Sequence, residues 1–236
     1  MKAFCAAAAA MALACGTFAD PAPQTWHIPP SLPVIGERSV AKIMDEIAAA
    51  QPAPAALAGT SGRLSVLVFK REARMETWRG GKKISDYALA APCKPGGPKL
   101  CEGDGLVPEG IYRFDVINTS AIHDIALQLS YPSDEDRAAA IEDGRCVDRD
   151  GPADLGGDVC VHGGTNTGSC IPLGGAIRGF FREAVLAGAA DAEIIIAPYD
   201  MRSGRDPAAE KGCSFNWYRK RLDAMAARLK EFPRAE

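Results

Sequence analysis

The chain has 236 residues, 47% of them hydrophobic and 24% charged, which is enough to fold one domain around its own hydrophobic core. The formal net charge of −3 argues against a nucleic-acid-binding protein, in which basic residues are usually in excess. The 17 prolines and 24 glycines favour a loop-rich fold over a bundle of helices.

Residues 1–19 have the composition of an export signal. Lys2 precedes an apolar, alanine-rich stretch from Phe4 to Leu13, and Thr17-Phe18-Ala19 supplies small residues at a cleavage site. The apolar stretch is shorter than the roughly 20 residues that a membrane span needs. We therefore expect an exported protein with no stable membrane span. Lipid attachment through Cys15 is an alternative, because the residues before it loosely resemble a lipobox.

Residues 20–62 are expected to form a leader rich in proline and alanine. Within it, Ser39 to Ala50 has a helical pattern, in which Ser39 is a suitable N-cap. The apolar residues that share one face of this helix are Val40, Ile43, Met44 and Ile47. Residues 51–62 have the composition of a linker, so the globular domain is expected to begin at residue 63.

From residue 63 onwards the sequence predicts short strands and three helices. The expected strands are Leu64–Lys70, Met75–Arg79, Lys83–Ala90, Ile111–Ile117, Ile125–Ser130, Gly157–Val161 and Glu193–Pro198. The expected helices are Asp134–Glu142, Ala176–Ala187 and Cys213–Phe232, the last with Trp217, Leu222, Met225 and Leu229 turned inward. The first three strands are spaced as a meander of hairpins, and a long loop over residues 92–110 follows them.

Six cysteines lie beyond the signal segment, and an oxidising compartment would let some of them pair. They are Cys93, Cys101, Cys146, Cys160, Cys170 and Cys213. Cys93 and Cys101 flank a short Pro/Gly loop, so we expect these two to pair first. If Cys170 is a free nucleophile, five cysteines remain and at least one more is unpaired. The sequence does not indicate partners for Cys146, Cys160 and Cys213.

The segment Val161–Gly174 is the strongest candidate for chemistry. His162 and Cys170 lie eight residues apart among glycines and hydroxyl residues. A thiol becomes a strong nucleophile when a nearby imidazole removes its proton or lowers its pKa. Glycines let the backbone approach a substrate and aim N–H groups at an oxyanion. The alternative is structural: His162 as a hydrogen-bonding residue, and Cys170 as a buried side chain or half of a disulfide.

Two other kinds of catalytic site are poorly supported. The chain has three histidines and no C-x-x-C pair, which argues against a zinc site built from several histidines. It has no G-x-S-x-G segment, which argues against a serine hydrolase with a nucleophile elbow. The Cys170–His162 pair therefore remains the preferred interpretation.

Several short motifs occur in a fixed order along the chain. They are Val66-Leu67-Val68-Phe69-Lys70, Gly97-Pro98-Lys99, Gly103-Asp104-Gly105, Pro108-Glu109-Gly110-Ile111-Tyr112, Asn118-Thr119-Ser120, Tyr131-Pro132, His162-Gly163, Cys170-Ile171-Pro172 and Ile196-Ala197-Pro198-Tyr199-Asp200-Met201. This order resembles the YafK-like branch of the L,D-transpeptidase (YkuD-domain) family. A series of motifs in order is more specific than any one of them. Two departures concern the nucleophile: Ser169 stands where the family usually has glycine, and Gly168 where many members carry a second histidine.

The resemblance implies a fold and a division of the chain. The fold is α+β and mainly β, an L,D-transpeptidase catalytic domain of β-sandwich-like sheets with flanking helices. This domain would cover residues 63–203, and residues 204–236 would add an amphipathic helix packed against it.

The resemblance also implies a mechanism on peptidoglycan stem peptides. His162 takes the proton of Cys170, and the thiolate attacks the carbonyl at the L-centre of meso-diaminopimelate. The carbonyl of Gly163 orients the imidazole, and backbone N–H groups near Gly168, Ser169 and Cys170 hold the oxyanion. The residues that could contact the stem peptide are Lys99, Asp104, Glu109, Tyr112, Thr167 and Arg202. Glu109 and Tyr112 have a structural role as their alternative. No metal or organic cofactor is implied.

Three functions follow from this resemblance, and the sequence does not choose among them. The acyl-enzyme would pass to an amine acceptor in a transpeptidase. It would pass to water in a hydrolase of the same bond, including one that releases a wall-linked protein. In a non-catalytic peptidoglycan-binding module, Cys170 would be held in a disulfide. Export and a cell-wall substrate together imply the bacterial periplasm.

Overall fold

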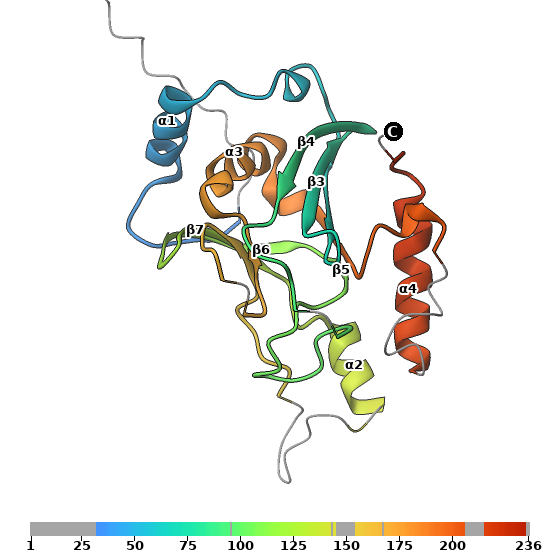
Figure 1. Ribbon diagram of the computed structural model, residues 1–236. Coiled ribbons are helices and arrows are strands. Elements are labelled where there is room, and N and C mark those ends of the chain that lie inside the picture. Colours follow the sequence, from blue (N-terminus) through green and yellow to red (C-terminus); the bar gives the residue numbers. More distant parts are fainter. Residues whose placement is uncertain are drawn as a thin grey trace, which may run out of the picture.

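The computed structural model describes residues 32–94, 96–142, 144, 154–166, 168–205 and 215–234 (Figure 1). The strands are β1 (Val34–Ile35), β2 (Leu64–Phe69), β3 (Arg74–Arg79), β4 (Lys82–Ala88), β5 (Gly110–Tyr112), β6 (Phe114–Ala121), β7 (Asp124–Leu129), β8 (Cys160–His162), β9 (Ile171–Pro172) and β10 (Glu193–Ala197). The α-helices are α1 (Val40–Ala50), α2 (Asp134–Glu142), α3 (Ile177–Ala187) and α4 (Asn216–Leu229), and η4 (Met201–Ser203) is a short 3-10 turn. The expected signal segment, Cys15, Cys146, Thr167 and Cys213 lie outside the described residues.

The strands form two five-stranded sheets. One sheet has the order β1-β6-β7-β8-β9, and the other has the order β4-β3-β2-β10-β5. The first three predicted strands do form an antiparallel meander, but β10 pairs in parallel with β2 and thereby joins β5 to the same sheet. With two mixed sheets and four α-helices in the described part of the chain, the predicted α+β, mainly β fold class is confirmed.

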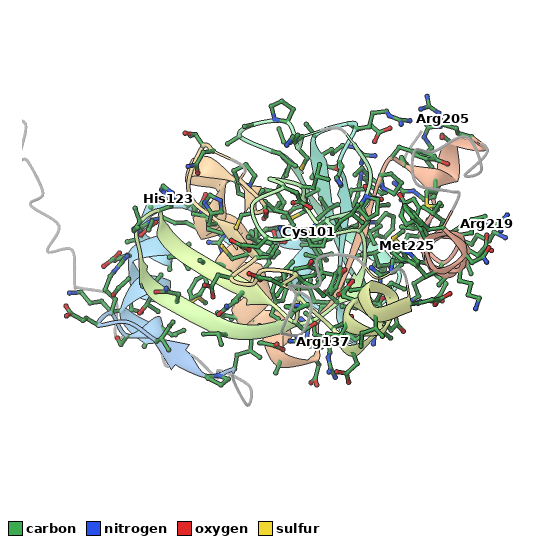
Figure 2. All side chains as sticks on the ribbon, turned by 90° about the horizontal axis from the view of Figure 1, so that it is seen from below. Cys101, His123, Arg137, Arg205, Arg219 and Met225 are labelled. Carbon is green, nitrogen blue, oxygen red and sulfur yellow. The ribbon has the colours of Figure 1, made fainter. Side chains whose placement is uncertain are left out.

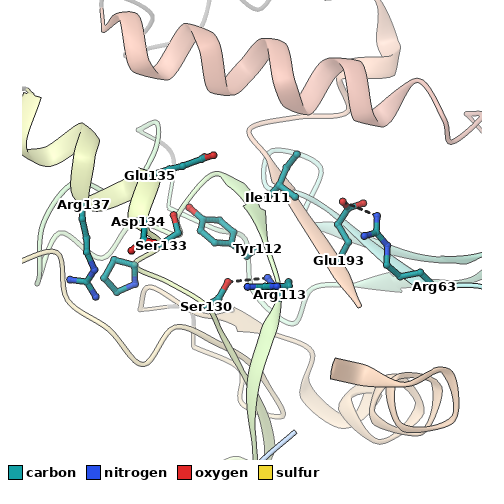
Figure 3. Close-up of a pocket in the computed structure, with 11 residues that line it drawn as sticks. Arg63, Ile111, Tyr112, Arg113, Ser130, Ser133, Asp134, Glu135, Arg137 and Glu193 are labelled. Atoms are coloured by element: carbon teal, nitrogen blue, oxygen red, sulfur yellow. Dashed lines mark hydrogen bonds and ion pairs between the residues drawn. The ribbon is translucent and has the colours of Figure 1, made fainter. Parts of the chain in front are cut away.

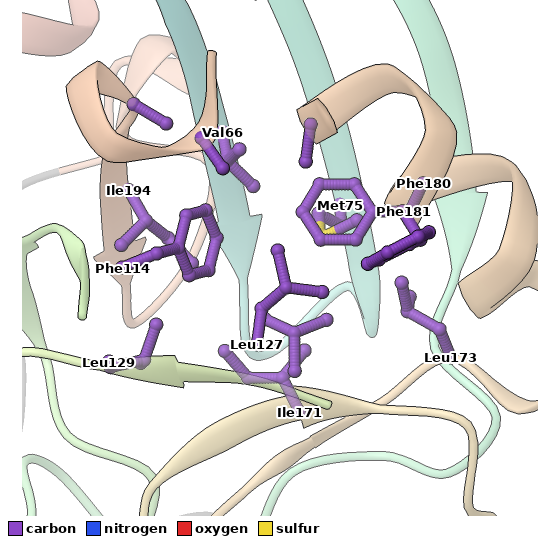
Figure 4. Packing of buried hydrophobic residues seen from close by; sticks show 14 of the residues in the cluster. Val66, Met75, Phe114, Leu127, Leu129, Ile171, Leu173, Phe180, Phe181 and Ile194 are labelled. Carbon is purple, nitrogen blue, oxygen red and sulfur yellow. The ribbon is translucent and has the colours of Figure 1, made fainter. Parts of the chain in front are cut away.

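Two hydrophobic cores lie on opposite faces of the second sheet. The larger core fills the space between the two sheets and beneath α3 (Figure 4). The smaller core lies between the second sheet and α4. Strand β2 supplies both, because side chains alternate along a strand: Val66 and Val68 enter the larger core, and Leu67 and Phe69 enter the smaller one. Every residue of β2 is accordingly buried.

The N-terminal helix is an integral part of the domain rather than an appendage. Ser39 caps α1 by accepting a hydrogen bond from the Lys42 N–H, as the sequence predicts. Ile43, Met44 and Ile47 are fully buried in the larger core, and β1 pairs in parallel with β6. The expected start of the domain at residue 63 therefore comes too late, because an amphipathic helix must bury its apolar face against something.

The other predicted elements differ in smaller ways. The expected strand over residues 111–117 is two strands in different sheets, β5 and β6, with Arg113 at the crossing. The two-residue strand β9 is too short to carry a pattern and was not predicted. In α4 the inward positions Leu222, Met225 and Leu229 are confirmed, while Trp217 is only partly buried. No helix among the described residues combines the length and the apolar character needed to cross a bilayer.

The predicted Cys93–Cys101 disulfide is wrong. Cys93 is a free thiol that points into the larger core, where it is only 7% exposed. Cys101 is disulfide-bonded, so its partner is not Cys93. Closeness in sequence does not provide the side-chain orientation that a disulfide needs. Three residues after Cys101, the Asp104 carboxylate accepts hydrogen bonds from the Leu100 and Cys101 N–H groups and so folds the loop back on itself.

Candidate active site

The two predicted catalytic side chains belong to neighbouring strands of the first sheet: His162 ends β8, and Cys170 directly precedes β9. Strands β8 and β9 run parallel, with Val161 opposite Ile171 and His162 opposite Pro172. One position earlier in this register, Cys160 comes opposite Cys170. Because side chains alternate, Val161 and Ile171 enter the core, while Cys160, His162 and Cys170 belong to the other face. The pairing of β8 with β9 thus brings the imidazole and the thiol to one face.

The Cys170 thiol is held by three groups from the chain just before His162. Its Sγ accepts hydrogen bonds from the Cys160 N–H at 3.4 Å and from the Cys160 thiol at 3.6 Å. It donates to the Asp158 carbonyl at 3.6 Å. The hydrogen bond from the Cys160 side chain is the main reason that the pKa of Cys170 is lowered to about 7, with further help from the Cys160 N–H and the positive charge of Lys99. The nucleophile is therefore substantially ionised near neutral pH.

The His162 imidazole is buried at 4% exposure and kept in its neutral form. Its Nδ1 accepts a hydrogen bond from the Gly164 N–H at 2.9 Å. Burial lowers the pKa of His162, and the nearby His123 lowers it further. A neutral imidazole is the form that accepts a proton. No hydrogen bond joins Cys170 to His162 within the described residues.

His123 is a site residue that the sequence analysis missed. It lies in the exposed turn between β6 and β7 (labelled in Figure 2), and its ring lies 5.0 Å from that of His162, at an interplanar angle of 30°. The pairing of β7 with β8, which sets Ala126 opposite His162, brings this turn to the imidazole. No local pattern could have revealed this contact, because the two histidines are 39 positions apart (162 − 123) and meet only through the sheet.

The glycines after His162 are required by this close approach. A Cβ at Gly163 would come within 2.4 Å of the His123 carbonyl oxygen, and a Cβ at Gly164 within 2.8 Å of the His162 ring. Either clash would displace the turn or the imidazole. This steric role of Gly163 differs from the predicted one, in which its carbonyl orients the imidazole. The group that contacts Nδ1 is the N–H of Gly164, a position that the sequence analysis did not single out.

Lys99 connects the Gly-Pro-Lys loop to the nucleophile. Its buried ammonium group donates to the Ser169 hydroxyl at 3.2 Å, to the Cys101 carbonyl at 2.8 Å and to Asp104 at 3.1 Å. Asp104 in turn accepts hydrogen bonds from three backbone N–H groups of its own loop. The predicted residues Lys99, Asp104 and Ser169 are therefore brought together next to Cys170. Gly168 is exposed, with a φ of +45°.

The remaining predicted substrate contacts lie in the framework of the fold. Glu109 is 1% exposed and bound to the ammonium group of Lys70 at 2.7 Å and to the Tyr218 hydroxyl. The Tyr112 hydroxyl donates to Asp136 at 3.2 Å. The Arg202 guanidinium pairs with Glu76 and Asp200, as described below. None of the hydrogen bonds or ion pairs among the described residues connects Glu109, Tyr112 or Arg202 to Cys170 or His162.

Cavities of the described surface lie away from this site. One cavity of about 570 Å³ lies beside β5 and the start of α2 (Figure 3). Arg63, Arg113 and Glu135 are among its lining residues, and neither Cys170 nor His162 is. The case for chemistry at Cys170 rests on the thiol, the imidazole and their neighbours, and not on cavity size. No group of three or more His, Cys, Asp and Glu side chains suited to a metal ion occurs in the described part of the chain.

Comparison with known proteins gives weak likenesses of fold. No family model matches the chain, and no curated protein matches it. Solved structures that resemble it include a variant of the helical cell shape determining protein Pgp2 from Campylobacter jejuni (TM-score 0.43, 16% identity, covering 66% of this chain and 53% of that one), Bd1075 from Bdellovibrio bacteriovorus (0.40, 20%, 59% and 49%) and L,D-transpeptidase 1 from Mycobacterium tuberculosis (0.33, 10%, 57% and 61%). The chain spans about half the length of the first two. At these values the likenesses do not assign the chain to a family, and a function must be argued from the site.

Proposed function

We propose that this chain is a cysteine-dependent acyltransferase of peptidoglycan, an L,D-transpeptidase that uses Cys170 as nucleophile and His162 as general base. The observation that carries the proposal is the chemistry of two side chains, Cys170 and His162, on one face of the β8–β9 pair. There a thiol with a pKa of about 7 shares a face with an imidazole whose pKa is lowered below its usual value. The motif order along the chain supports the same family of reactions, and with it an exported, periplasmic protein.

In the proposed first step, the Cys170 thiolate attacks the carbonyl at the L-centre of meso-diaminopimelate in a stem peptide. The thiol proton passes to His162, and the imidazolium then protonates the amine of the departing D-residue. For this attack the Cys170 side chain turns from Cys160 towards the substrate carbonyl. The product is an acyl-thioester, which an acceptor amine resolves into a new amide bond.

Backbone N–H groups at Ser169 and Cys170 are proposed to hold the oxyanion of this step. Their position depends on the loop between β8 and β9, and the Lys99 hydrogen bond to the Ser169 hydroxyl anchors that loop. Preorganised donors of this kind stabilise the transition state because they need no reorientation during the reaction. Gly163 positions the imidazole by leaving room for the turn that carries His123.

The test is mass spectrometry of muropeptides with tetrapeptide stems after incubation with the reduced wild-type protein. We expect dimers, or exchange of the terminal D-residue for an added D-amino acid. Cys170→Ala should abolish these products, because no other group supplies the acyl-enzyme. Cys93→Ala, which removes a buried free thiol elsewhere, is the matched control and should retain them.

Two other outcomes have a definite meaning. One outcome is that tripeptides form without dimers, and only when Cys170 is present. The reaction would then be hydrolysis of the same bond rather than transpeptidation, and the next assay would test release of a wall-linked protein. Identical product patterns for wild-type protein and Cys170→Ala would contradict a cysteine-dependent enzyme and favour a peptidoglycan-binding module.

A further inference from the structure

A second free thiol lies beside the proposed nucleophile. The Sγ atoms of Cys160 and Cys170 are 3.6 Å apart, and both side chains are half-buried at the end of the β8–β9 pair. The neighbouring residues Gly157, Asp158 and Gly168 are exposed, so a small reagent has a route to the pair. Cys93, the remaining free cysteine of the described residues, is buried in the larger core instead.

The backbone at this point suits a covalent bond between the two sulfurs. Neighbouring strands in a sheet are about 4.8 Å apart, which falls inside the range of roughly 4.4–6.8 Å between Cα atoms joined by a disulfide. The register of β8 and β9 brings Cys160 opposite Cys170 with both side chains on one face. Closing the sulfurs from 3.6 Å to a bond of about 2.05 Å needs side-chain rotation but no change of register.

We propose that Cys160 and Cys170 are a thiol–disulfide couple, in which an intramolecular disulfide reversibly masks the nucleophile. Cys160 is then a resolving cysteine, and the pair is a site of oxidative modification. The oxidant is a disulfide of the small-molecule class, with oxidised glutathione as the probe. The proposed consequence for catalysis rests on the proposed function, whereas the disulfide itself does not.

The chemistry balances as two successive thiol–disulfide exchanges. The Cys170 thiolate attacks one sulfur of the oxidant, forms a mixed disulfide and expels one thiolate. The Cys160 thiol then loses its proton and attacks Cys170 Sγ, which breaks the mixed disulfide and expels the second thiolate. Two protein thiols are oxidised and one external disulfide is reduced to two thiols. Cys170 is the first to react because its pKa is lowered, while the same hydrogen bond raises the pKa of Cys160.

The geometry also accounts for how the disulfide would act on the enzyme. In the present structure Cys170 Sγ contacts Cys160 and the Asp158 carbonyl, and not His162. A disulfide would hold the side chain in this orientation and remove the electron pair that attacks the substrate. Reduction would restore the thiol without any rearrangement of the sheets.

The experiment is to equilibrate the full chain in glutathione buffers of increasing oxidised fraction, alkylate the remaining thiols with iodoacetamide and digest with trypsin. Residues 150–178 form one tryptic peptide that contains both Cys160 and Cys170. We expect two alkyl groups on this peptide in reducing buffer. In oxidising buffer we expect no alkyl group on this peptide, and a peptide mass lower by two hydrogens than that of the dithiol form. The peptide of residues 100–113 reports on the Cys101 disulfide in the same samples.

The Cys160→Ala variant identifies the resolving role. With no second thiol, oxidised glutathione should stop at the mixed disulfide, so the peptide should carry glutathione on Cys170. The proposal is overturned if wild-type protein also accumulates glutathione on Cys170, or if both thiols remain alkylated in oxidising buffer. The wild-type result decides the matter by itself if the variant does not fold.

Assaying muropeptide products in the same buffers separates this inference from the proposed function. We expect activity to be lost completely as the disulfide forms, with the same midpoint in oxidised glutathione for both. A dithiol should restore the activity. An active reduced protein that forms no disulfide would overturn the redox couple and leave the enzyme. A disulfide that forms in a protein inactive even when reduced would overturn the enzyme and leave the couple.

Discussion

At the scale of single residues, the groups that donate hydrogen bonds to Cys170 determine the pKa of its thiol. The thiol of Cys160 and its N–H both donate to the nucleophile, and Lys99 adds a positive charge behind the neighbouring Ser169. These contacts stabilise a thiolate without a direct contact to His162. The His162 imidazole is held separately: its Nδ1 accepts a hydrogen bond from the Gly164 N–H, and burial and His123 lower its pKa.

This arrangement predicts the pH dependence of Cys170 alkylation. In reduced wild-type protein the rate with iodoacetamide should rise through a midpoint of about pH 7, because the thiolate is the reactive form. Cys160→Ala removes the largest cause of the lowered pKa, so its midpoint should move upwards, towards that of free cysteine at about 8.5. Mass spectrometry of the peptide of residues 150–178 measures both rates. Cys93→Ala is the control, and equal midpoints in wild type and Cys160→Ala would contradict the explanation.

The contact between the two histidines predicts a second titration. His123→Phe keeps a ring over His162 but removes the charge that lowers the pKa of His162. The His162 pKa should therefore rise in the variant, while staying below the usual value of about 6.5 because burial remains. NMR titration of the imidazole Cε1–H signals measures it, since the chain has three histidines and the variant only two. If the His162 pKa in the variant equals that in the wild type, His123 does not influence His162 and is not part of the site.

At the scale of secondary-structure elements, a buried charge network joins β3, η4 and the end of α4. The Arg202 guanidinium pairs with Glu76 at 3.1 Å and with Asp200 at 2.8 Å, and all three side chains are at most 6% exposed. It also donates to the carbonyl of Phe232, which follows α4. Burial is the largest single influence and pushes the pKa of Glu76 and of Asp200 up. The hydrogen bonds and charges of Arg202 and Arg74, with Trp78 at Glu76, together outweigh it, and both pKa values end below their usual range.

Arg202→Ala should therefore destabilise the protein by up to about 3–5 kcal/mol at neutral pH, because it removes one of the two guanidinium groups that pair with the buried Glu76 and Asp200 and leaves only Arg74. The lowered pKa values mean that this stabilisation is present above about pH 4 and is lost as the pH falls through the folded-state values. The difference in the free energy of unfolding between the variant and the wild type should accordingly become smaller in acid. Denaturant unfolding at several pH values measures it. Lys83→Ala, which removes an exposed ion pair from neighbouring β4, should cost less than about 1 kcal/mol, and an equally small loss for Arg202→Ala would contradict the network's role.

At the scale of the whole molecule, two hydrophobic cores share the central strands β2 and β10. Ile194 and Ile196 face the larger core, and Ile195 and Ala197 face α4. A strand that contributes to both cores couples their stability. The sheet that contains β8 and β9 lies across the larger core from this strand pair.

The shared strands predict that α4 does not unfold by itself. Met225→Ala removes a fully buried side chain from the smaller core and should lower the free energy of unfolding by about 2–5 kcal/mol. Unfolding followed by circular dichroism and by tryptophan fluorescence should remain one coincident transition. Exposed Lys220→Ala on the same helix should change stability by less than about 0.5 kcal/mol. Two separated transitions in Met225→Ala would show that the cores are independent.

The sequence alone determined the local features of this protein. The cap and apolar face of α1, the bounds of α2 and the strands of the meander follow from residue type and spacing, because these act over a few residues. Cys170 and His162 were singled out on the same grounds, and their catalytic role stays a proposal. The same reasoning singled out Lys99 and Asp104, although it assigned them to substrate where the structure has them organising the loop beside Ser169.

Only the tertiary structure decided which residues that are distant in sequence come into contact, because these contacts depend on strand order and register. The contact of His123 with His162 and the meeting of Cys160 with Cys170 arise from the pairings of β7, β8 and β9. The burial of Glu109, Tyr112 and Arg202, and the failure of Cys93 to pair with Cys101, depend equally on which face each side chain takes. A one-residue shift of register would reverse every such face, and spacing along the chain does not specify the register between distant strands.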